Sequence, residues 1–64
     1  MLIELDLEII HFTDDAILVS DGYVEKWLPL SQCRDEDGAR IEPVKGQSGT
    51  FQVEDFIAKR EGLI

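Results

Sequence analysis

The sequence has one cysteine and one histidine, Cys33 and His11, and this scarcity excludes several kinds of site. A single cysteine cannot form an intrachain disulfide, so nothing indicates an oxidising compartment. A zinc site normally takes four Cys or His ligands, or three in a catalytic centre, and this chain has only these two. The acids nearest to His11 lie in a predicted turn, and Cys33 has no histidine beside it. We therefore expect no enzyme, no metal and no cofactor.

Basic residues are also scarce. The chain has 6 Lys and Arg residues against 14 Asp and Glu residues, which gives a formal net charge of -8. Nucleic acids and anionic membranes bind clustered lysine and arginine, so both are disfavoured as direct ligands. A basic protein partner fits this charge, and solubility alone is the simpler explanation.

Long apolar runs are absent as well. No run approaches the roughly 20 residues of a membrane span, and the N-terminus lacks the basic and apolar segments of a signal peptide. These absences predict a cytoplasmic protein. A chain of 64 residues predicts one domain, 1–64, which is too small to enclose a deep catalytic pocket easily.

The segment IELDLEII, residues 3–10, alternates apolar and acidic side chains. A period of two is typical of a half-buried β-strand, so we predict a strand over residues 2–12. The alternation slips after Ile9, which indicates a bulge or bend. Glu4, Asp6 and Glu8 then share one face with no lysine or arginine among them, and their mutual repulsion lowers stability slightly.

The remaining patterns predict an α+β fold: a small curled antiparallel sheet of four to five strands, partly barrel-like, with one C-terminal helix. Asp21-Gly22 is a strong hairpin signal, and residues 29–38 are typical of a loop with a short helical turn. The helix is predicted over residues 53–64, with acids in its first turn, bases in its last and Gly62 after its end. Further strands are predicted at 16–19, 23–28 and 50–53, with a weak edge strand at 39–45.

Trp27 is the only tryptophan and lies on the strand predicted at 23–28. We expect its side chain in the core. The alternative is a partly exposed anchor for a partner, because Tyr23 and Trp27 share a face if this strand is regular.

The face of three acids is either a solvated exterior or a surface built to be negative. Alternate side chains of a strand stand about 6.6 Å apart. This spacing is on the scale of the phosphate spacing along an extended nucleic acid strand. Acids from the turns could extend such a face toward a groove that normally holds DNA. The candidate partner-binding residues are Glu4, Asp6, Glu8, Asp14, Asp15 and Asp21.

Two segments of the chain follow a distinctive pattern. The first is DDAILVSDGYVEKWLPLSQC, residues 14–33, which is similar to D-x-A-I/V-L-V/F, a short hairpin and V-W-I/L-P-x-S-Q-I/V, a pattern of small phage and prophage proteins. FQVEDFIAKREGLI, residues 51–64, is similar to their ending, V/F-x-I/V-P-E-W-L-A-x-x-K-G-L. Leu30, Glu54 and Phe56 stand where that group has lysine, proline and tryptophan, and these departures leave the implied fold intact.

The resemblance implies a phage or mobile-element origin and a small β-rich fold with a terminal helix. In size, charge and origin the chain also resembles anti-CRISPR proteins, several of which act as DNA mimics on basic surfaces of CRISPR effectors. On this analogy we expect a monomeric inhibitor in the bacterial host cytoplasm. Its expected partner is the basic surface of a CRISPR effector, first of type I, or of another nucleic-acid-binding protein. The alternative is a structural or accessory phage module that self-associates through a strand edge bordered by residues 38–49.

Overall fold

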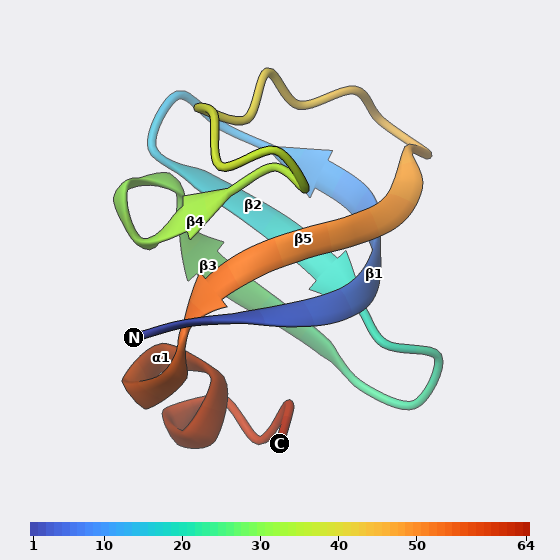
Figure 1. Ribbon diagram of the computed structural model, residues 1–64. Coiled ribbons are helices and arrows are strands. Elements are labelled where there is room, and N and C mark those ends of the chain that lie inside the picture. Colours follow the sequence, from blue (N-terminus) through green and yellow to red (C-terminus); the bar gives the residue numbers. More distant parts are fainter.

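The computed structural model describes all 64 residues as a five-stranded antiparallel sheet with one C-terminal helix, so the predicted α+β fold is confirmed. The strands lie in the order β3-β2-β1-β5-β4, and the sheet curls around its core without closing into a barrel (Figure 1). The elements are β1 (Leu2–Phe12), β2 (Ala16–Ser20), β3 (Glu25–Pro29), the 3₁₀ turn η1 (Leu30–Gln32), β4 (Cys33–Arg34), β5 (Ser48–Glu54) and α1 (Asp55–Arg60).

The central strand, β1, carries the alternation on which the fold depends. Leu7 and Ile9 are buried, whereas the acids that alternate with the apolar residues are exposed. β1 pairs with β5 along its first part and with β2 along its second. The β1–β2 register shifts between Ile9 and His11, so the predicted bulge is confirmed.

Asp21 and Gly22 lie in the loop that joins β2 to β3, as the hairpin signal predicts. The Asp21 carboxylate accepts hydrogen bonds from the backbone N–H groups of Tyr23 and Val24, at 2.8 and 2.9 Å. Gly22 has φ of 98°, a left-handed conformation that glycine adopts without steric cost. Because this loop uses Tyr23 and Val24, β3 begins at Glu25, two residues later than predicted.

The strand predicted at 39–45 is wrong, and the edge next to β5 is the two-residue strand β4. Ile41 in this irregular segment is nevertheless buried in the core. The two residues that follow this segment bond to β1 beside its bulge: the N–H of Ile9 donates to the Gln47 carbonyl and the N–H of Gly46 donates to the Ile9 carbonyl, both at 2.7 Å. These bonds satisfy backbone groups that β5 leaves free, since the β1–β5 pairing ends one residue earlier.

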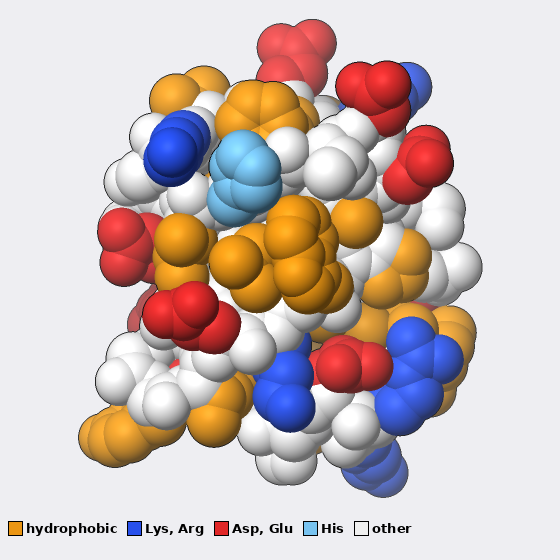
Figure 2. Space-filling view, turned by 180° about the vertical axis from the view of Figure 1, so that it is seen from behind, with side chains coloured by type: hydrophobic (Ala, Val, Ile, Leu, Met, Phe, Trp, Pro, Cys, Tyr) orange, Lys and Arg blue, Asp and Glu red, His pale blue; other side chains and the backbone are white.

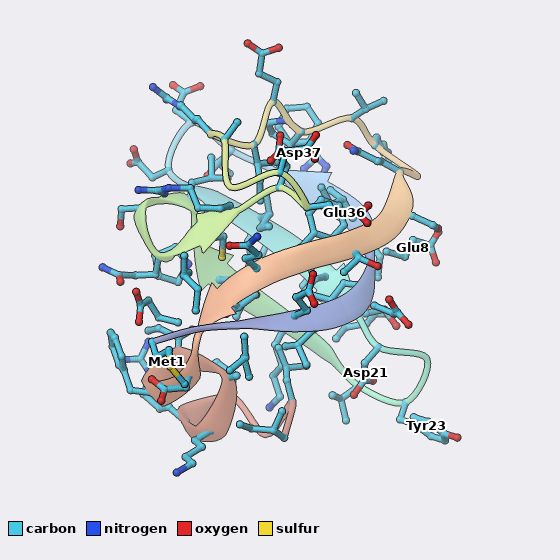
Figure 3. All side chains as sticks on the ribbon, viewed as in Figure 1. Met1, Glu8, Asp21, Tyr23, Glu36 and Asp37 are labelled. Carbon is cyan, nitrogen blue, oxygen red and sulfur yellow. The ribbon has the colours of Figure 1, made fainter.

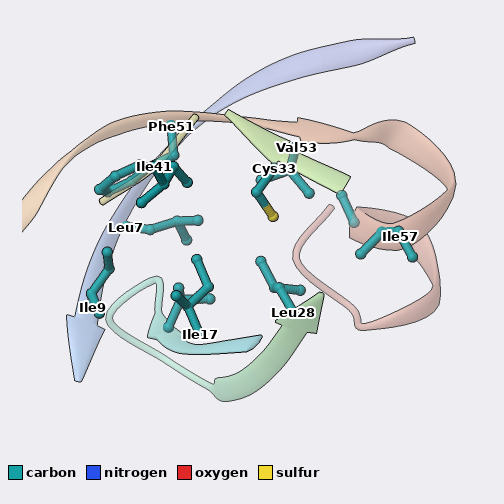
Figure 4. Close-up of a cluster of buried hydrophobic side chains, with 11 residues drawn as sticks. Leu7, Ile9, Ile17, Leu28, Cys33, Ile41, Phe51, Val53 and Ile57 are labelled. Carbon is teal, nitrogen blue, oxygen red and sulfur yellow. The ribbon is translucent and has the colours of Figure 1, made fainter. Parts of the chain in front are cut away.

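One hydrophobic core fills the inside of the curl (Figure 4). No polar or charged side chain is buried, and no buried side-chain polar atom lacks a partner. At roughly 25 cal/mol per Å² of apolar surface removed from water, this core is the main favourable contribution to the stability of so small a domain. The buried residues are Leu7, Ile9, Ile17, Val19, Leu28, Cys33, Ile41, Phe51, Val53, Ile57 and Ala58.

The terminal helix, α1, is shorter than the predicted helix of residues 53–64, because β5 continues to Glu54. Its predicted end is confirmed, since the N–H groups of Gly62 and Leu63 donate to carbonyls of the last helical turns and Gly62 has φ of 76°. These two bonds form a Schellman motif. No helix of the protein has the length and apolarity to cross a membrane.

The edge strands β3 and β4 carry features that discourage pairing, whereas β4 pairs β5 only at Gln52 and Val53 and leaves the stretch from Ser48 to Phe51 without a strand on that side. β4 has two residues. In β3, Lys26 is opposite buried Val19, so its side chain lies on the face of the sheet that faces the core, at the sheet edge. Pro29 has no N–H group and so removes one donor from this edge. Inward-pointing charges, prolines and short edge strands all discourage pairing between sheet edges.

Candidate functional site

Glu4, Asp6 and Glu8, which we call the acidic row, project from the outer face of β1 as the alternation predicts. Their cross-strand partners on β5 are uncharged: Gln52, Thr50 and Ser48. The three ion pairs of the structure lie elsewhere, between the N-terminus and two acids beside α1 and between two neighbours at the helix end. No lysine or arginine therefore neutralises the acidic row.

Two members of the row, Asp6 and Glu8, line a shallow hollow of about 330 Å³ together with Asp21. Glu8 and Asp21 lie on the same side of the molecule (Figure 3). The Thr50 hydroxyl donates a hydrogen bond of 2.8 Å to the Asp6 carboxylate and fixes its position. We call this hollow the acidic groove; it is lined by Asp6, Leu7, Glu8, Ser20, Asp21, Gly22, Ser48, Gly49 and Thr50.

Asp21 contributes to the fold and to the acidic groove at once. The backbone N–H groups of Val24 and Tyr23 donate to its Oδ1 atom and hold the pKa of the carboxyl below its usual range. The side chain is therefore ionised at neutral pH, and its Oδ2 atom is not used by these two bonds.

The predicted residues Asp14 and Asp15 do not join this surface. They precede β2 whereas Asp21 follows it, and a five-residue strand is about 13 Å long. Both line a separate hollow of about 680 Å³ whose lining also includes Arg34 and Arg40. This second hollow has mixed charge. Asp14 and Asp15 therefore belong to a different surface from the acidic row, and to one that is less negative.

Two acids outside the predicted set lie close to the acidic row. Glu25 is opposite Ser20, which is opposite Glu8, so the three side chains share the outer face. The Gln52 side chain donates a hydrogen bond of 3.0 Å to the Glu36 carbonyl and brings the loop after β4 near the row. The alternation within β3 could have identified Glu25. No local signal marks Glu36, because its position depends on pairing with β5.

The core position predicted for Trp27 is wrong, since the residue is 46% exposed. Its neighbour Leu28 faces the core, and adjacent residues of a strand point to opposite faces. Trp27 instead lies in line with Leu18 and His11 across three strands, which we call the aromatic row. Hydrophobic side chains gather beside the single histidine on this face (Figure 2). Tyr23 lies in the hairpin loop, outside β3 and outside this row.

The interior offers no reactive group. Cys33 is buried, and burial raises the pKa of its thiol to about 11, so the thiol is protonated at neutral pH. No group of three or more His, Cys, Asp or Glu side chains is placed to hold a metal ion.

Comparisons with protein-family models, with curated proteins and with solved structures found no match. The acidic row and the aromatic row are the surface features from which a function can be inferred.

Proposed function

We propose that this protein is a non-catalytic inhibitor of host defence, of phage or mobile-element origin, that acts in the bacterial cytoplasm. It binds the basic DNA-binding surface of a CRISPR effector complex, type I being the first candidate, and blocks target DNA as an acidic mimic. The observation that carries this proposal is the row of three carboxylates on β1 that no basic side chain neutralises.

The acidic row suits this role because it is held by the central strand of the sheet. Alternate residues keep a spacing of about 6.6 Å. Asp21 and Glu25 extend the negative surface from the neighbouring loop and strand. Charges on a paired strand lose little conformational freedom on binding, so less of the interaction energy is spent on ordering them.

The proposed mechanism is occlusion. A net charge of -8 steers the protein toward a basic groove and raises the association rate, and this attraction weakens as salt screens it. Once bound, the carboxylates occupy the positions that DNA phosphates need. The inhibitor and the target DNA therefore compete for one surface.

The two edge strands, β3 and β4, favour a monomer over a self-associating module. β4 is too short to template a second chain, and β3 carries Lys26 on its core side and Pro29 at its end. The alternative, self-association through a strand edge bordered by residues 38–49, would use the stretch of β5 from Ser48 to Phe51, which β4 does not pair.

The test is a titration of purified type I effector complexes of several subtypes at low and at high salt. We expect binding that weakens steeply with salt and that is lost when the effector is loaded with target DNA beforehand. If no subtype binds at low salt, the type I assignment is overturned. Equal binding to free and DNA-loaded effector overturns occlusion as the mechanism.

A further inference from the structure

We propose that the aromatic row is an arginine-binding surface, in which Trp27 stacks on a guanidinium group of the partner and Glu25 accepts its hydrogen bonds. This inference rests on the proposed function and adds a source of specificity beyond net charge. The occupant is an arginine side chain of the basic partner surface.

The indole of Trp27 is both accessible and held in place. Nearly half of the residue is exposed on the outer face of an edge strand. The His11 ring from β1 reaches across Leu18 and meets the indole with ring centroids 6.2 Å apart and 72° between the ring planes, an edge-to-face contact. A side chain positioned in this way loses little further freedom when a partner binds it.

The charge beside this indole selects a cation. Glu25 is exposed on the same face of β3, two positions before Trp27, at a Cα distance of about 6.6 Å. Lys26, the only base of β3, lies in the opposite register and forms no ion pair with Glu25. A group that covers the indole therefore meets a carboxylate that has no cation of its own.

Arginine fits these two features better than lysine. The guanidinium is planar and weakly hydrated, so it stacks on an aromatic face, and its N–H groups form a fork that matches a carboxylate. An ammonium group is a compact and strongly hydrated charge that makes fewer such contacts. Basic grooves that hold DNA present both residues, so the aromatic row would favour the arginine-rich parts.

The experiment uses oligo-arginine and oligo-lysine peptides of equal length as probes, with calorimetry for affinity and Trp27 emission as a local signal. Trp27 is the only tryptophan, so its fluorescence reports this face alone. We expect oligo-arginine to shift the emission and to bind roughly two- to fivefold more tightly than oligo-lysine. Trp27→Leu, which keeps an apolar side chain, should remove this preference, and Glu25→Gln should reduce it in a protein that keeps the indole.

Tyr23→Leu is the matched control, because Tyr23 is 94% exposed but lies outside the row. Equal affinity for the two peptides, no binding of either at low salt, or an equal effect of Tyr23→Leu would overturn the inference. Self-association that Trp27→Leu abolishes would also overturn it, since a second copy would then cover the row. None of these outcomes decides the proposed function. That proposal is tested separately, by comparing binding to free effector and to effector loaded with target DNA.

Discussion

Two kinds of carboxylate lie on the surface of this protein, and their surroundings differ. Asp21 and Asp35 fold back on their own loops; the Asp35 carboxylate accepts hydrogen bonds from the N–H groups of Asp37 and Ala39 at 2.9 and 2.8 Å. Glu4 and Glu8 project from a paired strand and form no ion pair. The first kind holds backbone groups, and Asp21 does so with one oxygen while it also lines the acidic groove; the second kind accepts no hydrogen bond from the backbone.

This difference shows why a count of acids overstates the surface available for binding. An aspartate next to glycine or within a turn tends to bond the backbone two residues on. An acid that alternates with buried residues has its position fixed by the strand, and its carboxylate is either free or held by a neighbouring side chain, as Asp6 is by Thr50. The residues on either side of each acid therefore indicate to which of the two kinds it belongs.

Reversal of the acidic row should have the largest effect. Glu4→Lys, Asp6→Lys and Glu8→Lys together should lower affinity for the partner by well over tenfold. Close charge pairs at desolvated interfaces contribute on the order of 1.5 kcal/mol or more each, and about 1.4 kcal/mol is already tenfold. The fold should survive because the three side chains are exposed, which circular dichroism can verify alongside the binding titration.

The matched control for that variant is Asp14→Lys, Asp15→Lys and Glu42→Lys, which changes the net charge equally. All three residues are exposed and line the hollows at the other end of β2. We expect a much smaller loss of affinity. An equal loss from the two triple variants would mean that only bulk charge matters and that the acidic row has no special role.

Removal of a backbone-binding carboxylate should have an intermediate effect, and on stability instead of binding. Asp35→Ala should lower the free energy of unfolding by about 1 kcal/mol, because two backbone N–H groups lose their acceptor. In a domain of this size such a loss lowers the thermal midpoint by roughly 4–8 °C. Asp35→Asn keeps an acceptor oxygen and should lose less. If thermal unfolding ranks the two variants in reverse, the loop is not held in this way.

The smallest effect concerns the N-terminal amine, which donates to Glu54 at 2.8 Å and to Asp55 at 3.1 Å. These hydrogen bonds, with Glu54 the stronger contributor, raise the pKa of the amine above its ordinary value near 8, and the same contact lowers the pKa of Asp55. The contribution of the amine is present below pH 8 and is lost as pH rises through the raised pKa. The contribution of Asp55 is present above about pH 4 and is lost as pH falls through the lowered pKa.

Thermal unfolding across pH should therefore show slightly lower midpoints at the alkaline and acid ends of this range. N-terminal acetylation removes the donor charge and should flatten the alkaline side. The amine is exposed and the two carboxylates are partly exposed, so solvent screening keeps the change small. A midpoint that falls equally with and without acetylation would assign the alkaline loss to other groups.

Local patterns predicted most of the sheet. The alternation of residues 3–10 indicated β1, the slip after Ile9 marked its bulge, and Asp21-Gly22 placed the hairpin. The acidic row followed from the same alternation. These features were predictable because a strand and a tight turn each leave a signal within a few residues.

The missed features depend on contacts between distant segments. β4 is defined only by its pairing with β5, in which Cys33 lies opposite Val53. Residues 39–45 form no strand, although Ile41 is buried in the core. The separation of Asp14 from the acidic row could have been derived, because Asp14 precedes β2 and Asp21 follows it. The position of Trp27 could have been derived, because Leu28 beside it was the better core residue.

The pairing of β1 with β5 also determines when the molecule can fold. Leu2 lies opposite Glu54, so β1 gains its second neighbour only when residues 48–54 are present. Closing so long a loop costs entropy before any contact compensates for it, and such topologies fold slowly. Before β5 is synthesised, β1 can pair with β2 but has no neighbour on its other side. The apolar inner face of β1, β2 and β3 is then open to water. The strand that carries the acidic row therefore has one unpaired side until residues 48–54 are present.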